Sequence, residues 1–388
     1  MKKTGIALAV AAGVGGVALN VFARRTPWRR SPWHLVGMAA GVVGTELSVP
    51  AAAAQLGATG LAAALGAGRS KIGAAALAVS AGAAVGLAAL QRPAADASRP
   101  LQGALDEVLG RGTVTLNAPT PLLPGKFRRT EFLVADGIRY GQGQALDVWH
   151  KAGVTNAPVL IQVHGGAWTS GDRRTQNLPL LAHMTEQGWV CVAVDYRLGP
   201  KNRWPAQIVD VKRAIAWVRA NIERYGGDPS FIAITGGSAG GHLAALAAVT
   251  GNDPAFQPGF EDADTSIQAG APLYGVYDLD ALNEDGSTGL RDHVRKAMID
   301  NQPDVAPASP IHRITPDSPP LLVVHGNRDE VVSVNQAREF ATRARELGAP
   351  IGYAELPYAH HAFDSLPSAR ALATAHAVEQ FLSHLAKH

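Results

Sequence analysis

A serine set between glycines is the first residue of this chain that could act as a nucleophile. Ser238 lies in the run GGSAG, which follows a strand-like apolar segment ending at Thr235 and precedes a helix-like run rich in Ala and Leu. A turn from strand to helix that exposes a serine is so tight that the positions two residues before and after it need glycine. Gly236 and Gly240 meet that need. The sequence therefore predicts that Ser238 is a nucleophile on a strand-to-helix turn.

A serine hydroxyl needs a base to remove its proton, and that base needs a carboxylate to orient it. Asp329 follows an apolar strand-like run and is the expected acid, whereas its competitor Glu330 directly precedes two valines that we expect to pack inward. Two adjacent histidines follow in a later loop, and His361, which begins a His-x-Phe pattern, is favoured over His360 as the base. We therefore expect a catalytic triad of Ser238, Asp329 and His361.

A second glycine-containing run, HGGAW at residues 164–168, ends another strand-like segment. Where a serine sits on such a turn, this position supplies backbone N–H groups to the negatively charged oxygen of the reacting carbonyl. We expect an oxyanion hole formed by the N–H groups of Gly165, Gly166 and Ala239, the last of which directly follows the nucleophile.

The sequence offers little for other chemistries or partners. It contains no His-Glu-x-x-His, no Cys-x-x-Cys and no lysine-containing phosphate loop, so we predict no metal and no cofactor. The formal net charge is +3, to which the early arginines contribute much, and the later part has no basic stripe interleaved with aromatic residues. Nucleic acid is therefore not an expected partner. Cys191 is the single cysteine, and its apolar surroundings in the sequence predict a place in the core.

The segments that must position these residues alternate between strand-like and helix-like from about residue 126 onward. Such alternation is typical of an α/β fold with a mostly parallel central sheet flanked by helices. The clearest amphipathic helix spans residues 205–225, with apolar residues three and four positions apart. The expected strands are 157–163, 190–195, 231–235, 267–273, 320–325 and 351–356.

The first 92 residues are rich in Ala and Gly and contain two long uncharged stretches, Thr4 to Ala23 and Ile72 to Leu90. A helix of about 20 residues spans the roughly 30 Å hydrocarbon core of a bilayer. We predict membrane spans in residues 1–92, a linker at 93–125 and a catalytic domain at 126–388. The alternatives are a secretory signal peptide for the first stretch, or soluble or surface-lying helices, because Ala is only weakly hydrophobic.

The number of spans decides the side of the catalytic domain. Residues 35–68 could form one span or a hairpin at Pro50, and the four arginines between residues 24 and 30 are expected to face the cytoplasm. Three spans place the domain in the cytoplasm and four place it outside, and the sequence leaves this open. Because the triad and oxyanion residues all come later, a fragment starting near Pro100 is expected to be soluble and active.

Residues 126–388 resemble the hormone-sensitive-lipase-like esterases and the related bacterial carboxylesterases and lipases of cell envelopes. Two positions depart from the family pattern: Ala167 stands where a third glycine is usual, and Gly237 where Asp or Glu commonly precedes the serine. The resemblance implies an α/β-hydrolase fold and a serine carboxylesterase or lipase that works through an acyl-enzyme without a cofactor. The shared motifs are HGG at 164–166, DYRL at 195–198 with WPA at 204–206, YGGDP at 225–229, GSAGG at 237–241 and HAF at 361–363.

The substrate class is narrowed by the stretch 279–309, which we expect to be an insertion that covers the site. Its shortness favours short- to medium-chain esters, as small molecules or lipids. Two alternatives stay open. The HGGAW form is also similar to the arylformamidase-like branch, which implies attack on an amide or formamide, and a hydrolase-like fold without turnover would be a binding protein.

Overall fold

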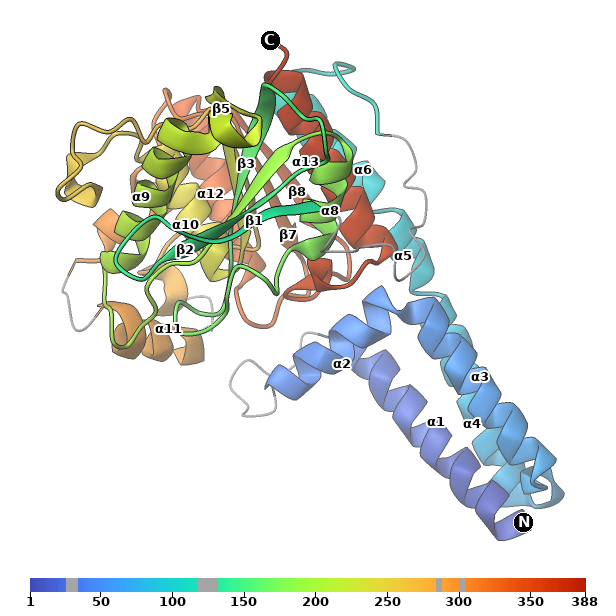
Figure 1. Ribbon diagram of the computed structural model, residues 1–388. Helices are drawn as coiled ribbons and strands as arrows, with labels where there is room; N and C mark the ends of the chain where they lie inside the picture. Colours follow the sequence, from blue (N-terminus) through green and yellow to red (C-terminus); the bar gives the residue numbers. More distant parts are fainter. Residues whose placement is uncertain (26–33, 117–131, 284–287, 300–303) are drawn as a thin grey trace.

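The computed structural model describes residues 1–25, 34–116, 132–283, 288–299 and 304–388, which form an α/β unit joined to a set of N-terminal helices (Figure 1). The α/β unit is built on an eight-stranded sheet in the order β1-β2-β4-β3-β5-β6-β7-β8. From β4 to β8 all neighbours are parallel, whereas β2 is antiparallel to β1 and to β4. The predicted α/β fold is confirmed. The strands are β1 (Leu133–Arg139), β2 (Ala145–Trp149), β3 (Ala157–Val163), β4 (Val190–Val194), β5 (Gly227–Gly237), β6 (Ala269–Leu273), β7 (Leu321–Gly326) and β8 (Ile351–Leu356).

The two antiparallel strands, β1 and β2, are missing from the sequence prediction. Strand β1 lies at the sheet edge, and none of its residues is fully buried, so it has no apolar run. Strand β2 contains the buried Asp147, which accepts hydrogen bonds from Gly137 N at 2.8 Å and from Arg173 Nε at 2.7 Å. Hydrophobic periodicity does not reveal a strand whose buried positions include a paired charge.

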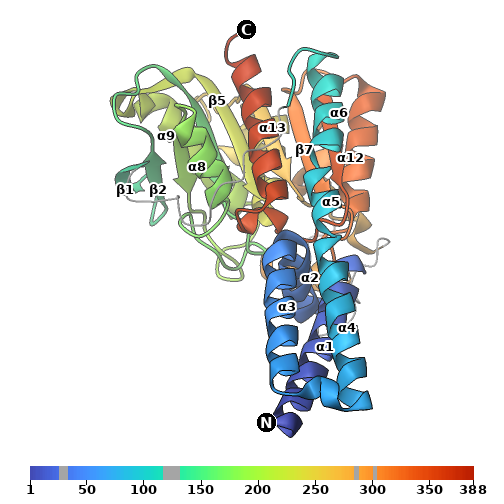
Figure 2. The same ribbon diagram turned by 90° about the vertical axis from the view of Figure 1, so that its right-hand side faces the viewer.

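Helices cover both faces of the sheet and divide the core into two layers (Figures 1 and 2). Along β3, Val159 and Ile161 pack into one layer and Leu160 into the other, as the alternation of side chains in a strand requires. The buried Cys191 belongs to the second layer, as predicted. The first layer contains α9 (Ala206–Asn221), α10 (Ala239–Val249) and α12 (Val334–Leu347), and the second contains α6 (Ser98–Leu109), α8 (Leu178–Glu186) and α13 (Ala369–Leu385).

Short helices and single helical turns complete the described chain. These are α5 (Gln91–Ala95), α11 (Thr288–Val294), η1 (Ala67–Arg69), η2 (Ile222–Tyr225), η3 (Pro254–Phe256), η4 (Ala281–Asn283), η5 (Arg295–Ile299), η6 (Ala306–Ala308), η7 (Pro310–His312) and η8 (Phe363–Ser365).

Four longer helices precede the α/β unit: α1 (Lys2–Arg24), α2 (His34–Glu46), α3 (Ser48–Ala64) and α4 (Lys71–Ala88). We call these four helices the helical unit. By length and composition, the described stretches Lys2–Arg24 and Lys71–Leu109 are each able to cross a membrane, and α2 with α3 would make a third span. The sequence leaves open one span or a hairpin at Pro50 for residues 35–68, and in the structure the sharp bend comes before Pro50. The chain bends by 92° between Glu46 and Ser48, and Pro50 lies in the first turn of α3, where its missing N–H leaves no intrahelical bond unmade.

Helix α1 packs closely on α3 and α4 because small residues line its buried side. Polar side chains link the three helices: Gln55 donates to Ala12 O at 2.8 Å and to Ser80 Oγ at 2.7 Å, and Asn20 donates to Ala83 O at 2.8 Å. In apolar surroundings an unpaired polar group is costly, so these paired groups hold the helices in one arrangement. The buried small residues of α1 are Gly5, Ala9, Gly13, Gly16 and Ala23.

Helix α6 lies within the stretch that the sequence predicts as a linker, yet it is part of the core of the α/β unit. Its residues Leu101 and Leu105 are fully buried. A Cβ on Gly352 of β8 would lie only 2.1 Å from Ala104 O, so the helix rests directly on the strand backbone. A fragment that starts near Pro100 would therefore lose the first turn of a core helix. The predicted domain limits at 93 and 126 stay a prediction.

The contact between α6 and β8 predicts opposite effects for two glycine substitutions. Gly352→Ala should lower the free energy of unfolding by about 1–3 kcal/mol, because the added methyl group has no space. Gly103 lies on the exposed side of α6 and has open space around its Cα, so Gly103→Ala should raise the free energy of unfolding by roughly 0.5–1 kcal/mol. Urea unfolding of both variants measures this, and equal effects would contradict the packing.

Candidate active site

The nucleophile candidate lies on the sharp turn between β5 and α10. Ser238 has the dihedral angles φ 59° and ψ −122°, a region that residues with side chains seldom occupy. A Cβ on Gly236 would lie 2.5 Å from Gly240 O, and a Cβ on Gly240 would lie 2.1 Å from Val163 O. The turn therefore requires glycine at both positions, which is the reason that the sequence motif is readable.

Three loops bring the predicted catalytic side chains together at the carboxyl ends of the parallel strands. His361 Nε2 lies 2.9 Å from Ser238 Oγ, and His361 Nδ1 lies 2.7 Å from Asp329 Oδ2. The serine follows β5, the aspartate follows β7 and the histidine follows β8. The three side chains form a continuous hydrogen-bonded line.

The carboxylate of Asp329 is held from several sides. Its Oδ1 accepts the N–H groups of Val331 and Val332 at 2.9 and 2.8 Å, and its Oδ2 lies 3.1 Å from His325 Nε2. Burial by itself would raise the pKa of Asp329, but His361 and His325 hold it below its ordinary value. Burial would lower the pKa of His361, but the Asp329 carboxylate more than offsets this and keeps that pKa above its ordinary value. The pair thus favours a charged, fixed imidazolium when His361 takes up a proton.

The competing residues Glu330 and His360 pair with one another instead. Their side chains are buried, and His360 Nδ1 lies 3.1 Å from Glu330 Oε2. The two loops therefore form two neighbouring histidine–carboxylate pairs, of which only one reaches the serine.

The predicted oxyanion run at 164–168 lies next to the serine turn. A Cβ on Gly165 would lie 3.2 Å from Ser238 Cβ. However, the N–H of Gly165 already donates to Gln176 Oε1 at 2.6 Å. Among the described residues, none accepts a hydrogen bond from the N–H of Gly166, Ala167 or Ala239. Gln176 is a residue that the sequence did not single out, because it lies in a loop without a motif.

The turn that carries these N–H groups is firmly held. Gly166, Ala167 and Trp168 all have positive φ angles, of 115°, 51° and 60°. The Trp168 indole is buried and donates to His242 Nδ1 at 3.2 Å. In the stretch 279–309, the Nε2 atom of His293 in α11 lies 3.0 Å from Ala167 O, so the described part of the expected insertion reaches this turn. Residues 284–287 and 300–303 of that insertion lie outside the described residues.

A buried pair behind His361 explains the second departure from the family pattern, Gly237. The hydroxyl group of Tyr274 donates to Asp364 Oδ1, and a Cβ on Gly237 would lie 2.4 Å from that hydroxyl oxygen. The Tyr274 ring also meets the His361 ring edge to face, with centroids 4.9 Å apart. Burial raises the pKa of Asp364 to about 6. Tyr274 occupies the space that an acidic side chain at position 237 would need.

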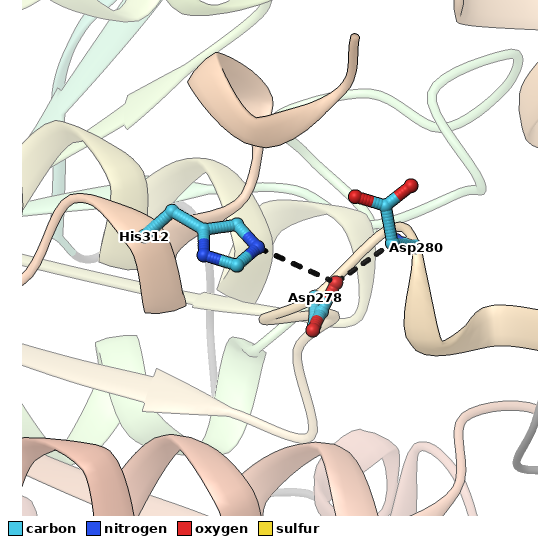
Figure 3. Close-up of side chains that lie close together, drawn as sticks. All are labelled: Asp278, Asp280 and His312. Carbon is cyan, nitrogen blue, oxygen red and sulfur yellow. Dashed lines mark hydrogen bonds and ion pairs between the residues drawn. The ribbon is translucent and has the colours of Figure 1, made fainter.

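Figure 3 shows the one group of described residues with the ligand types and spacing of a metal site, Asp278, Asp280 and His312. Asp278 Oδ1 accepts the backbone N–H groups of Asp280 and Ala281 at 2.9 and 3.2 Å and lies 4.0 Å from His312 Nε2. These are the bonds of a turn capped by its own aspartate. We assign no ligand to this group.

The fold and the site geometry define the class as an α/β-hydrolase esterase. The family model described as BD-FAE matches residues 146–344, and the chain belongs to this family. "Probable carboxylic ester hydrolase LipM" of Mycobacterium tuberculosis is 44% identical over 98% of this chain and 93% of its own length. "Esterase LipQ" of the same organism is 50% identical over 68% of this chain and 65% of its own length. A solved esterase from Thermogutta terrifontis, Est2 with butyrate bound, has a TM-score of 0.55 and 25% identity over 64% of this chain and 93% of its own. The protein is a carboxylic ester hydrolase.

The crowding at Gly237 predicts a coupling between two positions. Gly237→Ala should lower the free energy of unfolding by about 1–3 kcal/mol in the natural chain, because its methyl group meets Tyr274. In a Tyr274→Leu background the same change should cost markedly less, because the phenol is gone. Unfolding curves for the four proteins of this cycle measure the coupling, and the same cost in both backgrounds would show that Tyr274 is not the obstacle.

Proposed function

We propose that this protein is a membrane-bound serine carboxylesterase that hydrolyses short- to medium-chain esters through Ser238, His361 and Asp329. The observation that carries the proposal is the hydrogen-bonded line of these three side chains, with distances of 2.9 and 2.7 Å. A serine so placed has a base at its hydroxyl group, and the base has a buried carboxylate at its other nitrogen, which is the arrangement that acyl transfer requires.

In the proposed reaction, Ser238 Oγ attacks the ester carbonyl while His361 Nε2 takes its proton. His361 then protonates the leaving alcohol, and an acyl-enzyme remains on Ser238. A water molecule then attacks the acyl group while His361 takes its proton, and His361 passes that proton to Ser238 Oγ as the acid leaves, which restores the free enzyme. Asp329 stays deprotonated throughout and stabilises the imidazolium form of His361.

For the oxyanion hole we propose the N–H groups of Gly166, Ala167 and Ala239. The sequence favours Gly165 in place of Ala167, but the bond from Gly165 to Gln176 uses that donor. The N–H of Ala167 is next along the same turn, and the Gln176 side chain then serves to hold the turn. The substitution of the family's third glycine by Ala167 is compatible with this role, because the donor is the backbone group.

A short acyl group is supported by the solved relatives. Solved structures of the Thermogutta terrifontis esterase carry butyrate and propionate, and the second has a TM-score of 0.54 and 26% identity to this chain. An amide substrate is the second candidate, since "Arylacetamide deacetylase" of Bos taurus is 38% identical over 28% of this chain. A panel of p-nitrophenyl esters from acetate to palmitate, beside acetanilides and aryl formamides, separates these substrates.

Membrane association is supported by where the apolar surface lies. The large hydrophobic side chains that are most exposed among the described residues are concentrated in the helical unit, and Val134 is the single one that lies in the α/β unit. An exposed apolar surface of this kind marks a contact with lipid or protein. Those of the helical unit are Val10, Val14, Val17, Val21, Val36, Val43, Val49, Leu56, Leu61, Ile72, Val79 and Val85, besides Met1.

The helical unit also relates the two sides of the proposed membrane to the active site. Helix α1 ends beside the α/β unit, where Ala23 O lies 3.3 Å from His360 Nε2, whereas the N-terminus and the connection between α3 and α4 lie at the far end of the helices (Figures 1 and 2). The end of α1 and the active site are therefore on the same side of a membrane that is crossed by α1, by α4 and by the bent pair of α2 and α3. If the arginines after α1 face the cytoplasm, as we expect from the sequence, the active site faces it too.

The triad predicts how much kcat falls in three variants and in which direction the pH profile of one of them moves. Ser238→Ala and His361→Ala should each lower kcat by roughly 10⁴- to 10⁶-fold, with Asp329→Asn costing less. Only neutral His361 can act as the base, so kcat/KM should fall as the pH drops through the pKa of His361, which Asp329 holds above its ordinary value. In Asp329→Asn this acid limb should move to lower pH, because the anion that favours the charged ring is gone. Steady-state kinetics with p-nitrophenyl butyrate tests this, and an unmoved limb would contradict the role of Asp329.

The membrane proposal predicts how the full-length protein fractionates. It should sediment with membranes, resist extraction by sodium carbonate and dissolve in detergent, because three apolar helices would have to leave the bilayer. A tag at the C-terminus should be protected from protease in intact cells and digested in inverted vesicles. Recovery in the soluble fraction without detergent would refute the membrane proposal and leave the esterase proposal untouched.

A further inference from the structure

The loop from Pro357 to Ser368, which carries His361, lies between two parts of the protein. On one side His361 reaches Ser238, and on the other side the neighbouring His360 reaches the helical unit. Because the two histidines are adjacent in the backbone, the same short stretch of chain carries the ring at the active site and the ring at the helical unit.

His360 is enclosed by groups from three elements. Its Nδ1 lies 3.1 Å from Glu330 Oε2, and its Nε2 lies 3.3 Å from Ala23 O in the last turn of α1. The carbonyl groups of a last helical turn have no partner within the helix, so His360 supplies one. The ring of His360 thus has a polar partner at each of its two nitrogens, one from the α/β unit and one from α1.

Helix α2 leaves space for this ring through a missing side chain. A Cβ on Gly41 would lie 2.5 Å from His360 Cε1 and 2.6 Å from its Nδ1. The ring is fully buried and paired at both nitrogens, so it cannot swing away to relieve such a contact. The His360 ring therefore occupies the space that a side chain at position 41 would need.

The far end of the same loop is held by the helical unit as well. Glu46, the last residue of α2, forms a fully buried ion pair with Arg370 and accepts the hydroxyl group of Ser368 at 2.6 Å. Arg370 also donates to Pro357 O at 3.0 Å, which ties the start of the loop to its end. Breaking a buried pair of this kind leaves an uncompensated charge, so the attachment is strong.

We propose that the helical unit sets the position of the catalytic histidine through His360, a positioning residue clamped between Ala23, Gly41 and Glu330. This inference rests on the proposed function of Ser238, His361 and Asp329. The helices are then part of the catalytic apparatus besides being a membrane anchor. A change at the helix packing alters turnover without touching the substrate.

The test compares two glycine substitutions in the full-length protein, purified in lipid nanodiscs. Gly41→Ala places a methyl group against His360 and should lower kcat for p-nitrophenyl butyrate by about 10- to 100-fold with little change in KM, because a small misplacement of a catalytic group is enough. It should slow the labelling of Ser238 by a fluorophosphonate to the same extent and move the acid limb of kcat/KM. Gly57→Ala on α3, which has open space around its Cα, is the matched control and should behave as the natural protein does.

A double variant makes the role of His360 specific. His360→Ala should lower kcat about as much as Gly41→Ala, and Gly41→Ala added to His360→Ala should cost nothing further, because the ring that the methyl group displaces is absent. His360→Asn, which keeps a donor toward Glu330 and loses the one toward Ala23, should fall between His360→Ala and the natural protein. If Gly41→Ala does not fold, the kcat, labelling rate and pH profile of His360→Asn test the proposal in its place.

Two results would overturn the proposal. One is that folded Gly41→Ala, or His360→Asn, has the same kcat, labelling rate and pH profile as the unsubstituted protein. The other is an equal loss in Gly57→Ala, which would show a general effect of disturbed helices. The natural protein is measured in the same assay, so a failure of the proposed esterase function would appear as absent turnover in every sample.

Discussion

The close approach of three backbone segments around Ser238 is the constraint on which the site depends. The end of β3, the end of β5 and the start of α10 lie so near one another that a Cβ on Gly240 would meet Val163 O at 2.1 Å. This crowding lifts the serine out of the sheet, in an uncommon backbone conformation, and brings the HGGAW run beside it. The distance between Ser238 and the HGGAW run is thus set by backbone packing and not by flexible side chains.

Buried carboxylates complete the site, and each has a defined partner. Asp329 is surrounded by donors and stays charged beside His361. Asp364, with one partner hydroxyl group from Tyr274 and a pKa raised to about 6 by burial, lies behind the same histidine. The family's acidic residue before the serine is absent, and the Tyr274–Asp364 pair fills the space where it would lie. The side chain that packs against His361 here is therefore that of Tyr274.

The helical unit and the α/β unit meet at the loop between β8 and α13. Contacts through His360, Ser368 and Arg370 connect that loop to α1 and α2, and all are buried. A simple anchor would need no such contacts, because a flexible linker holds an enzyme at a membrane equally well. The expectation that a fragment starting near Pro100 is active stays a prediction, and these contacts show where the first hundred residues dock on the loop.

The amino-acid sequence predicts the serine turn, the HGGAW run beside it and the succession of parallel strands, because each rests on local chemistry. Glycines at 236 and 240 are needed within a five-residue turn, and apolar runs reveal buried strands. It also pointed to His361 and Asp329 over their neighbours, by motif and by the expected packing of the valines after Glu330. Tertiary structure alone decided the rest. Strand β2 holds a buried charge whose partners, among them Arg173 and the N–H of Gly137, come from other segments, and the N–H of Gly165 donates to a side chain eleven residues away. The tyrosine against Gly237 and the glycine against His360 come from segments remote in sequence, so no local pattern records them.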